Sequence, residues 1–381
     1  MEEKHQLKNL WKELFNDDLE YINWYFENIY CENTTRILKE DEEVLGMIFE
    51  NTYDISVDKS DIMSRYLVGV GVAPHRRGEG IMQKLLLESL EDSKRRKEEF
   101  VYLTPIDNEI YKKFGFGYIS SIAEYKLEFE KLKEFKKSHK IQKISKVSFS
   151  VEILDEIANF YNKITKNYFI KVGRDREVYN KIFSELFCED GVAYTSRDGS
   201  NEINGYMFVL KSEDILIKEI LFENKEVLSS LFSIVYGYKN YYSKVKVICA
   251  EDSYLEDYFK SDKGVIKTIK NKIQARIISP ELALMRISEK LEDDEVLKIY
   301  IYDEVIKDNE GCYQIDKNSI KKIDQKCDLE ITISDLVTLI YGFRNADNAI
   351  KTGCLKINNK NINQILDKIF VKKINYFNQD F

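Results

Sequence analysis

The chain has 381 residues, enough for two to four domains at roughly 100–200 residues each. Apolar residues make up 44% and charged residues 33%, while the 16 glycines and 3 prolines are too few for a collagen-like or low-complexity chain. The net charge of −8 argues against a general nucleic-acid-binding protein, because attraction to phosphates needs a basic face.

Cysteine and histidine are sparse and scattered. The nearest two of the six cysteines are 15 residues apart, and none of the three histidines lies near a cysteine. We therefore expect reduced thiols in a cytoplasmic protein and no metal site. The sequence has neither an apolar leader nor a run of 18 apolar residues, so we expect no membrane partner.

Hydrophobic periodicity divides the first third of the chain into alternating helices and strands. The expected elements are helices at 7–15 and 21–30, strands at 35–39, 44–49 and 65–72, a helix at 80–98, a strand at 100–103, a helical turn at 109–113 and a strand at 125–129. The lysine-rich segment 131–146 is weakly periodic and is equally consistent with a linker and with a solvated helix.

A second mixed unit and a third follow, with a boundary near 277–280. In the second, helices are expected at 151–165, 176–187 and 227–238, and strands at 191–194, 205–210, 215–221 and 245–249. In the third, we expect a two-strand pattern at 297–306, a strand at 331–333 and helices at 334–341 and 362–370. The order of elements in the second unit echoes the first without a clear sequence repeat.

The segment 70–82, VGVAPHRRGEGIM, combines a strand, a loop with two glycines and the start of a helix. The first N–H groups of that helix are free, and the positive end of its dipole points into the loop. Gly78 and Gly80 have no Cβ, so a phosphate can approach the backbone. The pattern therefore indicates a pyrophosphate cradle, with an ordinary strand–loop–helix turn as the alternative.

Two common phosphate-binding loops do not fit this segment. A Walker A loop needs Lys followed by Ser or Thr after its last glycine, but Ile81 and Met82 follow Gly80. A dinucleotide fingerprint needs its glycines between strand and helix, but Gly69 and Gly71 lie within the strand. The segment instead resembles the coenzyme A loop [QR]xxGx[GA] of GNAT acetyltransferases, with Met82 in place of the final small residue.

A second segment, Tyr111–Phe116 (YKKFGF), follows one helix and one strand later. It resembles the GNAT element that lies beside the thioester sulfur. The alternative for Tyr111 is a packing tyrosine, but its occurrence together with the loop favours a catalytic role.

The strings APHRRGEGI, IYKKFGFG, ARIISPELAL and ISDLVTLIYGFRNADNAIKTGCL together resemble the Eis (enhanced intracellular survival) family. This resemblance implies an α+β chain of tandem GNAT folds, with mixed, mostly antiparallel sheets flanked by helices, followed by a sterol-carrier-protein-like α/β domain. The implied domains are an N-terminal acetyltransferase domain at 1–130, a central GNAT-like domain without a cofactor loop at 131–275, and the carrier-like domain at 276–381. It also suggests a homohexamer.

The resemblance also assigns roles to individual residues. Tyr111 matches a general acid, and the α-carboxylate of Phe381 matches the group that accepts the proton of the amine. A base is required because amines with a pKa of about 10.4 are mostly protonated at pH 7. The residues implied to contact acetyl-CoA are Val70, Gly71, Val72, Arg77, Gly78, Glu79, Gly80, Ile81, Met82, Gln83, Ile106 and Asp107.

The expected function is an acetyl-CoA-dependent N-acetyltransferase acting by direct attack on the thioester. The resemblance suggests a cationic small molecule of the aminoglycoside or polyamine type as acceptor; a protein lysine is an alternative, and so is a non-catalytic lipid- or CoA-binding protein. Trp24 and Phe26 are candidates for the acceptor pocket, although an ordinary aromatic core stripe is the better explanation for most residues of helix 21–30.

Overall fold

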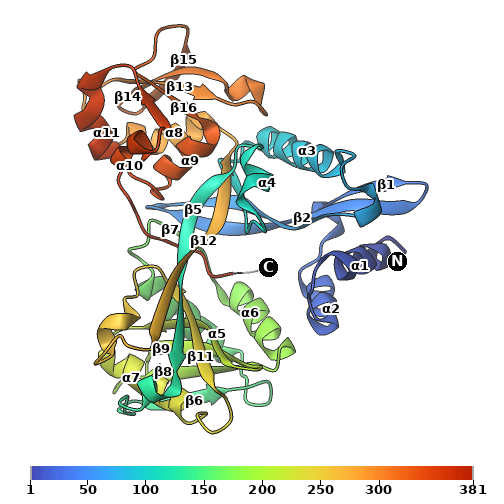
Figure 1. The fold of residues 1–381 in the computed structure, drawn as a ribbon, viewed down its shortest axis with the longest axis vertical. Coiled ribbons are helices and arrows are strands. Elements are labelled where there is room, and N and C mark those ends of the chain that lie inside the picture. Colours follow the sequence, from blue (N-terminus) through green and yellow to red (C-terminus); the bar gives the residue numbers. More distant parts are fainter. Residues whose placement is uncertain (1, 380–381) are drawn as a thin grey trace.

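The computed structural model describes residues 2–379, and one long sheet runs through its first two lobes (Figure 1). A separate five-stranded sheet forms a third domain at one end. This arrangement confirms the predicted α+β fold class. The main sheet has 13 strands; β1 pairs with β2, and the others follow the order β18-β7-β2-β3-β4-β12-β5-β11-β10-β9-β8-β6.

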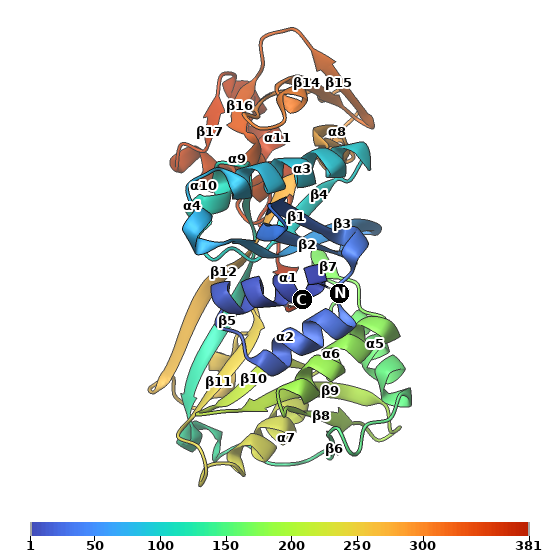
Figure 2. The same ribbon diagram turned by 90° about the vertical axis from the view of Figure 1, so that its right-hand side faces the viewer.

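The N-terminal lobe is a layered structure in which helices cover both faces of the sheet (Figure 2). Alternate residues of one strand explain the layers: Met47 and Phe49 pack toward the N-terminal helices, and Ile48 packs toward the helix after the glycine loop. The elements are α1 (Glu2–Leu14), α2 (Leu19–Asn28), β1 (Thr35–Glu40), β2 (Glu43–Val57), β3 (Ser60–Val72), α3 (Ile81–Arg95), β4 (Phe100–Leu103), α4 (Asn108–Lys112) and β5 (Gly117–Glu128).

The central lobe contains β6 (Lys140–Ile144), α5 (Glu152–Ile164), β7 (Ile170–Val172), α6 (Arg176–Cys188), β8 (Val192–Arg197), β9 (Ile203–Lys211), β10 (Ile215–Phe222), α7 (Lys225–Tyr236), β11 (Lys244–Ala250) and β12 (Val265–Ile277). Both interpretations of 131–146 are wrong for its second half, because β6 pairs antiparallel with β8. As the last strand of the sheet, β6 buries only Ile144, so its apolar pattern is weak.

The two lobes share their strands. β5 pairs with β12 and, through its second half, with β11 of the central lobe. The end of β12 returns to the N-terminal lobe, where residues 274–277 pair with β4. The sheet is therefore continuous across both predicted boundaries, and the limits at 130 and 275 stay a prediction.

The third domain contains α8 (Pro280–Ser288), β13 (Leu297–Tyr302), β14 (Gly311–Asp316), β15 (Ser319–Ile323), β16 (Leu329–Thr332), α9 (Ile333–Ile340), α10 (Ala346–Lys351), β17 (Leu355–Ile357) and α11 (Asn363–Ile369). Cys312 and Cys327 lie next to each other, with Cα atoms 6.3 Å apart, a separation that a disulfide can span. The β14–β15 hairpin brings them together by turning the chain back within their 15-residue separation, and the expectation of reduced thiols stays a prediction.

After α11 the chain runs back to the waist between the two lobes (Figure 1). There β18 (Asn375–Tyr376) pairs parallel with β7. The Asn375 amide donates to the backbone carbonyls of Ile119 at 2.6 Å and Tyr341 at 2.7 Å, which fixes the segment against both neighbouring domains.

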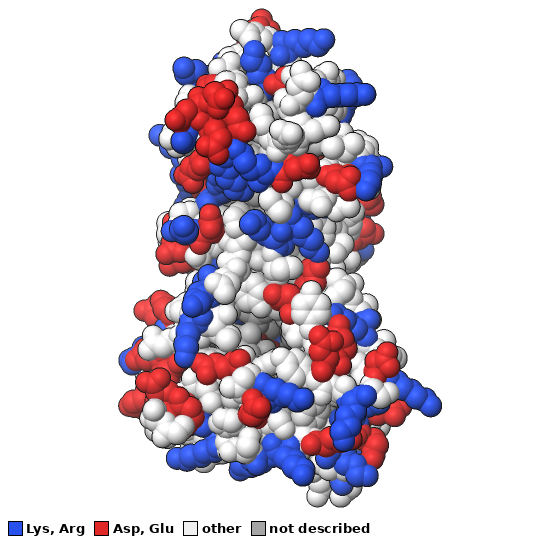
Figure 3. All heavy atoms as spheres, turned by 90° about the vertical axis from the view of Figure 1, so that its left-hand side faces the viewer, with Lys and Arg blue, Asp and Glu red and all other residues white. Residues whose placement is uncertain are grey.

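Two further features are the distribution of surface charge and the length and hydropathy of the helices. On the face shown in Figure 3, cationic and anionic side chains are interspersed. Among the helices described, none is long and apolar enough to span a bilayer.

A fully buried ion pair provides a test of the packing between the N-terminal lobe and the third domain. Arg276 donates to both carboxylate oxygens of Asp303, at 2.8 and 2.6 Å, and to the Phe114 carbonyl at 2.7 Å. Arg276→Met should lower the free energy of unfolding by about 3–5 kcal/mol, because it leaves a buried carboxylate without its cation. Denaturant unfolding measures this loss.

Arg95→Met is the matched control, because the Arg95 side chain is 68% exposed and its pair with Asp92 lies on the surface. It should cost less than about 1 kcal/mol. An equal loss in the two variants would contradict the importance of the Arg276 pair.

Candidate functional site

β3 and β4 pair for only a short distance and then separate. Their parallel ladder is limited to Arg65 with Val101 and Tyr66 with Tyr102. β3 continues to Val72 along β2, whereas β4 ends at residue 103. Within the described chain, the edge of β3 beyond Tyr66 therefore offers backbone N–H and C=O groups to a ligand.

A bulge bends β3 where the two strands separate. Gly69 and Val70 together lie opposite the single residue Ile48 of β2. Gly69 has a φ of 59°, and a Cβ there would lie 2.7 Å from the Phe49 ring and 3.1 Å from Trp11. Only glycine fits this position, and the expected contact residues 70–72 follow directly after it.

The glycine loop forms an open cradle at the start of α3. Gly78 and Gly80 have φ values of 85° and 79°, and no heavy atom lies within 4 Å of the position that a Cβ would occupy at either. The first bond of the helix joins the Lys84 N–H to the Gly80 carbonyl at 3.0 Å. The N–H groups of residues 81–83 therefore have no intrahelical acceptor and are available to an anion.

Charged side chains hold this loop against the first hairpin. Arg76 donates to Glu79 at 2.8 Å and also pairs with Glu40 of β1. The Glu79 carboxylate is thus engaged within the loop, while Arg77 is exposed beside the glycines. The loop thus carries an exposed cation next to N–H groups that have no intrahelical acceptor.

Tyr111 lies in the same apolar cluster as the start of α3. The cluster includes Ile81 and Leu103, and Val70 and Met82 pack against it. Tyr111 is 4% exposed, and burial raises its pKa to about 12. The phenol therefore keeps its proton at neutral pH and can serve as a donor.

Two further predicted contact residues lie at the start of α4. Asp107 caps this helix by accepting from the Glu109 N–H at 2.9 Å, while Ile106 is 77% exposed. The cap fixes the helix that carries Tyr111.

An acidic pocket of about 780 Å³ opens beside the bulge, where Val68 and Gly69 form part of its lining. Six carboxylates and two lysines line it; Lys218 pairs with Glu185 at 2.9 Å and with Glu189 at 3.3 Å. The carboxylates belong to Asp17, Asp18, Glu20, Glu185, Glu189 and Asp190. Among the described residues, no group of three or more His, Cys, Asp or Glu side chains is placed to hold a metal ion.

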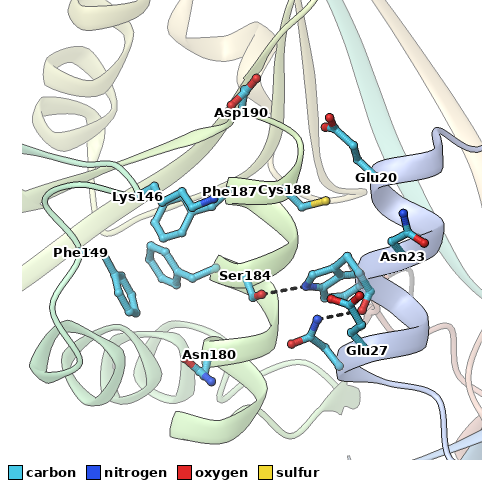
Figure 4. A pocket seen from close by; sticks show the side chains of 13 residues that line it. Glu20, Asn23, Glu27, Lys146, Phe149, Asn180, Ser184, Phe187, Cys188 and Asp190 are labelled. Atoms are coloured by element: carbon cyan, nitrogen blue, oxygen red, sulfur yellow. Dashed lines mark hydrogen bonds between the residues drawn. The ribbon is translucent and has the colours of Figure 1, made fainter.

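The structure places Trp24 and Phe26 in different surroundings. The indole N–H of Trp24 donates to the Ser184 hydroxyl at 2.8 Å. Trp24 is one of the residues that line a neighbouring pocket of about 680 Å³ between α2 and α6 (Figure 4). Phe26 is 1% exposed in an aromatic cluster with Trp11 and Phe49. Their roles in acceptor binding stay a prediction.

The C-terminal segment reaches the place where β3 and β4 separate. The Phe377 ring lies 5.4 Å from the Tyr102 ring, and the Asn378 amide donates to the Lys218 carbonyl at 3.0 Å. Phe381, the predicted base, lies outside the described residues. Residues 377–378 thus contact both the place where β3 and β4 separate and Lys218, which lines the acidic pocket.

Two family models match the chain. An acetyltransferase (GNAT) domain matches residues 1–119, and a sterol carrier protein domain matches residues 281–378. No curated protein sequence matches significantly.

Solved structures share this fold over nearly the whole chain. A probable N-acyltransferase from Enterococcus faecalis has a TM-score of 0.84 at 19% identity, with 99% of this chain and 97% of that one covered. A GCN5-related N-acetyltransferase from Anabaena variabilis has a TM-score of 0.81 at 16% identity, with 99% and 97% covered. Eis1 from Mycobacterium abscessus has a TM-score of 0.76 at 16% identity, with 100% and 97% covered. Residues 1–119 are therefore a GNAT acetyltransferase domain and residues 281–378 a sterol carrier protein domain, and the chain as a whole shares its fold with Eis1 and with the two other solved structures.

Proposed function

We propose that this protein transfers the acetyl group of acetyl-CoA to a primary amine of a cationic small molecule, of the aminoglycoside or polyamine type. One observation carries the proposal. The open edge of β3 leads to the glycine cradle at its C-terminal end, and its bulge at Gly69 lines the acidic pocket. Donor and acceptor would thus meet on one strand.

The donor side fits a thioester with a pyrophosphate. The open backbone of residues 70–72 supplies hydrogen bonds to an extended amide chain, and the free N–H groups at the start of α3 suit the phosphates. Arg77 adds a positive charge. We propose the same contacts for the loop residues Gly78, Glu79, Gly80, Ile81, Met82 and Gln83, and for Ile106 and Asp107.

Tyr111 would protonate the departing thiolate. A thiol has a pKa of about 8.5, and its departure is assisted by a proton donor within reach. Tyr111 packs with the residues that surround the open strand edge, and its raised pKa keeps it protonated. The geometry therefore supports a general acid at this position.

The acceptor side favours cations. The excess of carboxylates attracts an ammonium group, and the concave shape suits a small molecule better than a flat protein surface. We propose the terminal carboxylate of Phe381 as the group that accepts the proton of the amine. A cytoplasmic location and a homohexamer are also part of the proposal. The location rests on the scattered cysteines, and the homohexamer rests on the family resemblance alone.

Gly80→Val tests the cradle. The β-branched side chain would fill the open space and oppose the positive φ, so CoA affinity should fall about 10- to 100-fold in calorimetry, given about 1.5–3 kcal/mol per hydrogen bond to a charged group. Gly353→Val is the control, because Gly353 also has a positive φ and open space around its Cβ position but lies in the third domain. Unchanged affinity in Gly80→Val would remove the loop from the site.

Tyr111→Phe tests the general acid. Acetyl transfer should slow about 10²- to 10⁴-fold while CoA affinity stays within about twofold, because only a hydroxyl is lost. With a pKa of about 12, the wild-type tyrosine should impose no loss of rate as the pH rises to about 9. Tyr313→Phe, which removes a buried hydroxyl in the third domain, should keep full activity. Near-native turnover in Tyr111→Phe would reduce this residue to a packing role.

The acceptor class is tested by thiol release from acetyl-CoA with polyamines, aminoglycosides and lysine peptides. Asp18→Asn should raise KM for the best cationic acceptor several-fold without changing KM for acetyl-CoA, and high salt should shrink the difference. Asp18 makes no side-chain cap bond, so its loss should cost little stability. Asp293→Asn, in the third domain, is the control. Preference for a lysine peptide over every small amine would overturn the proposed acceptor.

A further inference from the structure

A buried ion pair in the central lobe has no part in the chemistry described above. Arg174, between β7 and α6, donates to both oxygens of Glu219 on β10, at 2.8 and 2.9 Å. Their side chains are 0% and 3% exposed. The guanidinium also lies 4.7 Å from the centre of the Tyr161 ring. This is a fixed, desolvated charge pair inside the lobe.

Such a pair adds little net stability, because the cost of removing two charges from water offsets most of their attraction. Its third partner indicates another role. The free branch of the Arg174 guanidinium donates to the backbone carbonyl of Asn378 at 2.6 Å. The Asn378 amide in turn donates to Glu219 at 3.1 Å and to the Lys218 carbonyl at 3.0 Å. Three hydrogen bonds thus hold Asn378 of the C-terminal segment: one from the guanidinium, one to the carboxylate and one to the β10 backbone.

The held residue lies beside the acidic pocket. Glu185 and Lys218 line that pocket and also line a small cavity with Asn378 and Gln379. Asn378 precedes the end of the chain by three residues, a distance of at most roughly 10 Å for an extended backbone. Holding Asn378 therefore limits where the terminal carboxylate can go.

We propose that Arg174 and Glu219 are positioning residues that hold the C-terminal segment so that its carboxylate is delivered to the amine. The inference rests on the proposed function, in which that carboxylate accepts the proton. A proton acceptor must lie within hydrogen-bond reach of the amine, and a misplacement of 1 Å can cost about 10²-fold in rate. The ion pair acts through the tail and touches neither substrate.

We call Arg174, Glu219 and Asn378 the clamp, and three variants each remove a different part of it. Arg174→Lys keeps the charge but loses the planar fork that reaches Glu219 and Asn378 together. Glu219→Gln removes the negative charge of the carboxylate that pairs with Arg174. Asn378→Ala removes two hydrogen bonds near the chain end without altering a core side chain. The matched control is Arg286→Lys, which alters another forked pair, with Glu99; within the described residues, neither partner is hydrogen-bonded to Asn378.

Each variant should lower kcat/KM for the acceptor about 10- to 100-fold and leave the calorimetric affinity for CoA within about twofold. The pH profile should change as well. Without a placed base, the rate should rise about tenfold per pH unit between pH 6 and 9, since it follows the free fraction of an amine with a pKa of about 10.4. Arg286→Lys should keep the wild-type profile.

A chain extended by Gly-Ser after Phe381 distinguishes failure of the proposed base from failure of the clamp. The extension converts the Phe381 carboxylate into a neutral amide and leaves the clamp residues unchanged. Full activity of the extended chain would overturn the terminal carboxylate as the base. An inactive extended chain together with wild-type profiles in all three clamp variants would overturn the clamp alone. Parallel losses of CoA affinity and kcat in Asn378→Ala would also overturn it, since they would indicate a general structural effect.

Discussion

The insertion of β12 between β4 and β5 is the constraint on which the rest of the structure depends. A strand that ends the central lobe supplies hydrogen bonds to the N-terminal sheet, so the two lobes cannot separate without breaking a ladder. β4 is held by β12 on one edge and by β3 for only two residue pairs on the other. The separation of β3 from β4 is therefore set by the sheet itself rather than by a mobile loop.

This constraint divides the candidate site into two sides, the acidic pocket and the glycine loop. The bulge at Gly69 turns β3 so that the residues before it line the acidic pocket and the residues after it lead to the glycine loop. The carboxylates of that pocket come from both lobes. A shared sheet keeps them at a fixed spacing, which a flexible linker between independent domains could not do.

Local features of the site could be predicted from the sequence, and non-local ones could not. The loop glycines and Tyr111 lie in short segments whose pattern reflects their own backbone, and the structure places both beside the open edge of β3. The strands β6 and β12 were missed because their partners lie far away in sequence and their exposed faces carry lysines. The same holds for Glu185 and the buried Arg174, which no local motif connects to the N-terminal lobe.

The pairing of β18 with β7 has a consequence for how the protein is made. β7 pairs on its other edge with β2, so a strand of the first lobe and the last strand of the chain flank one short strand of the second. During synthesis both lobes leave the ribosome before residues 375–376, and until then one edge of β7 lacks its partner. Translation that stops before residue 375 would therefore yield a chain with both lobes but an exposed strand edge, a target for proteolysis or aggregation.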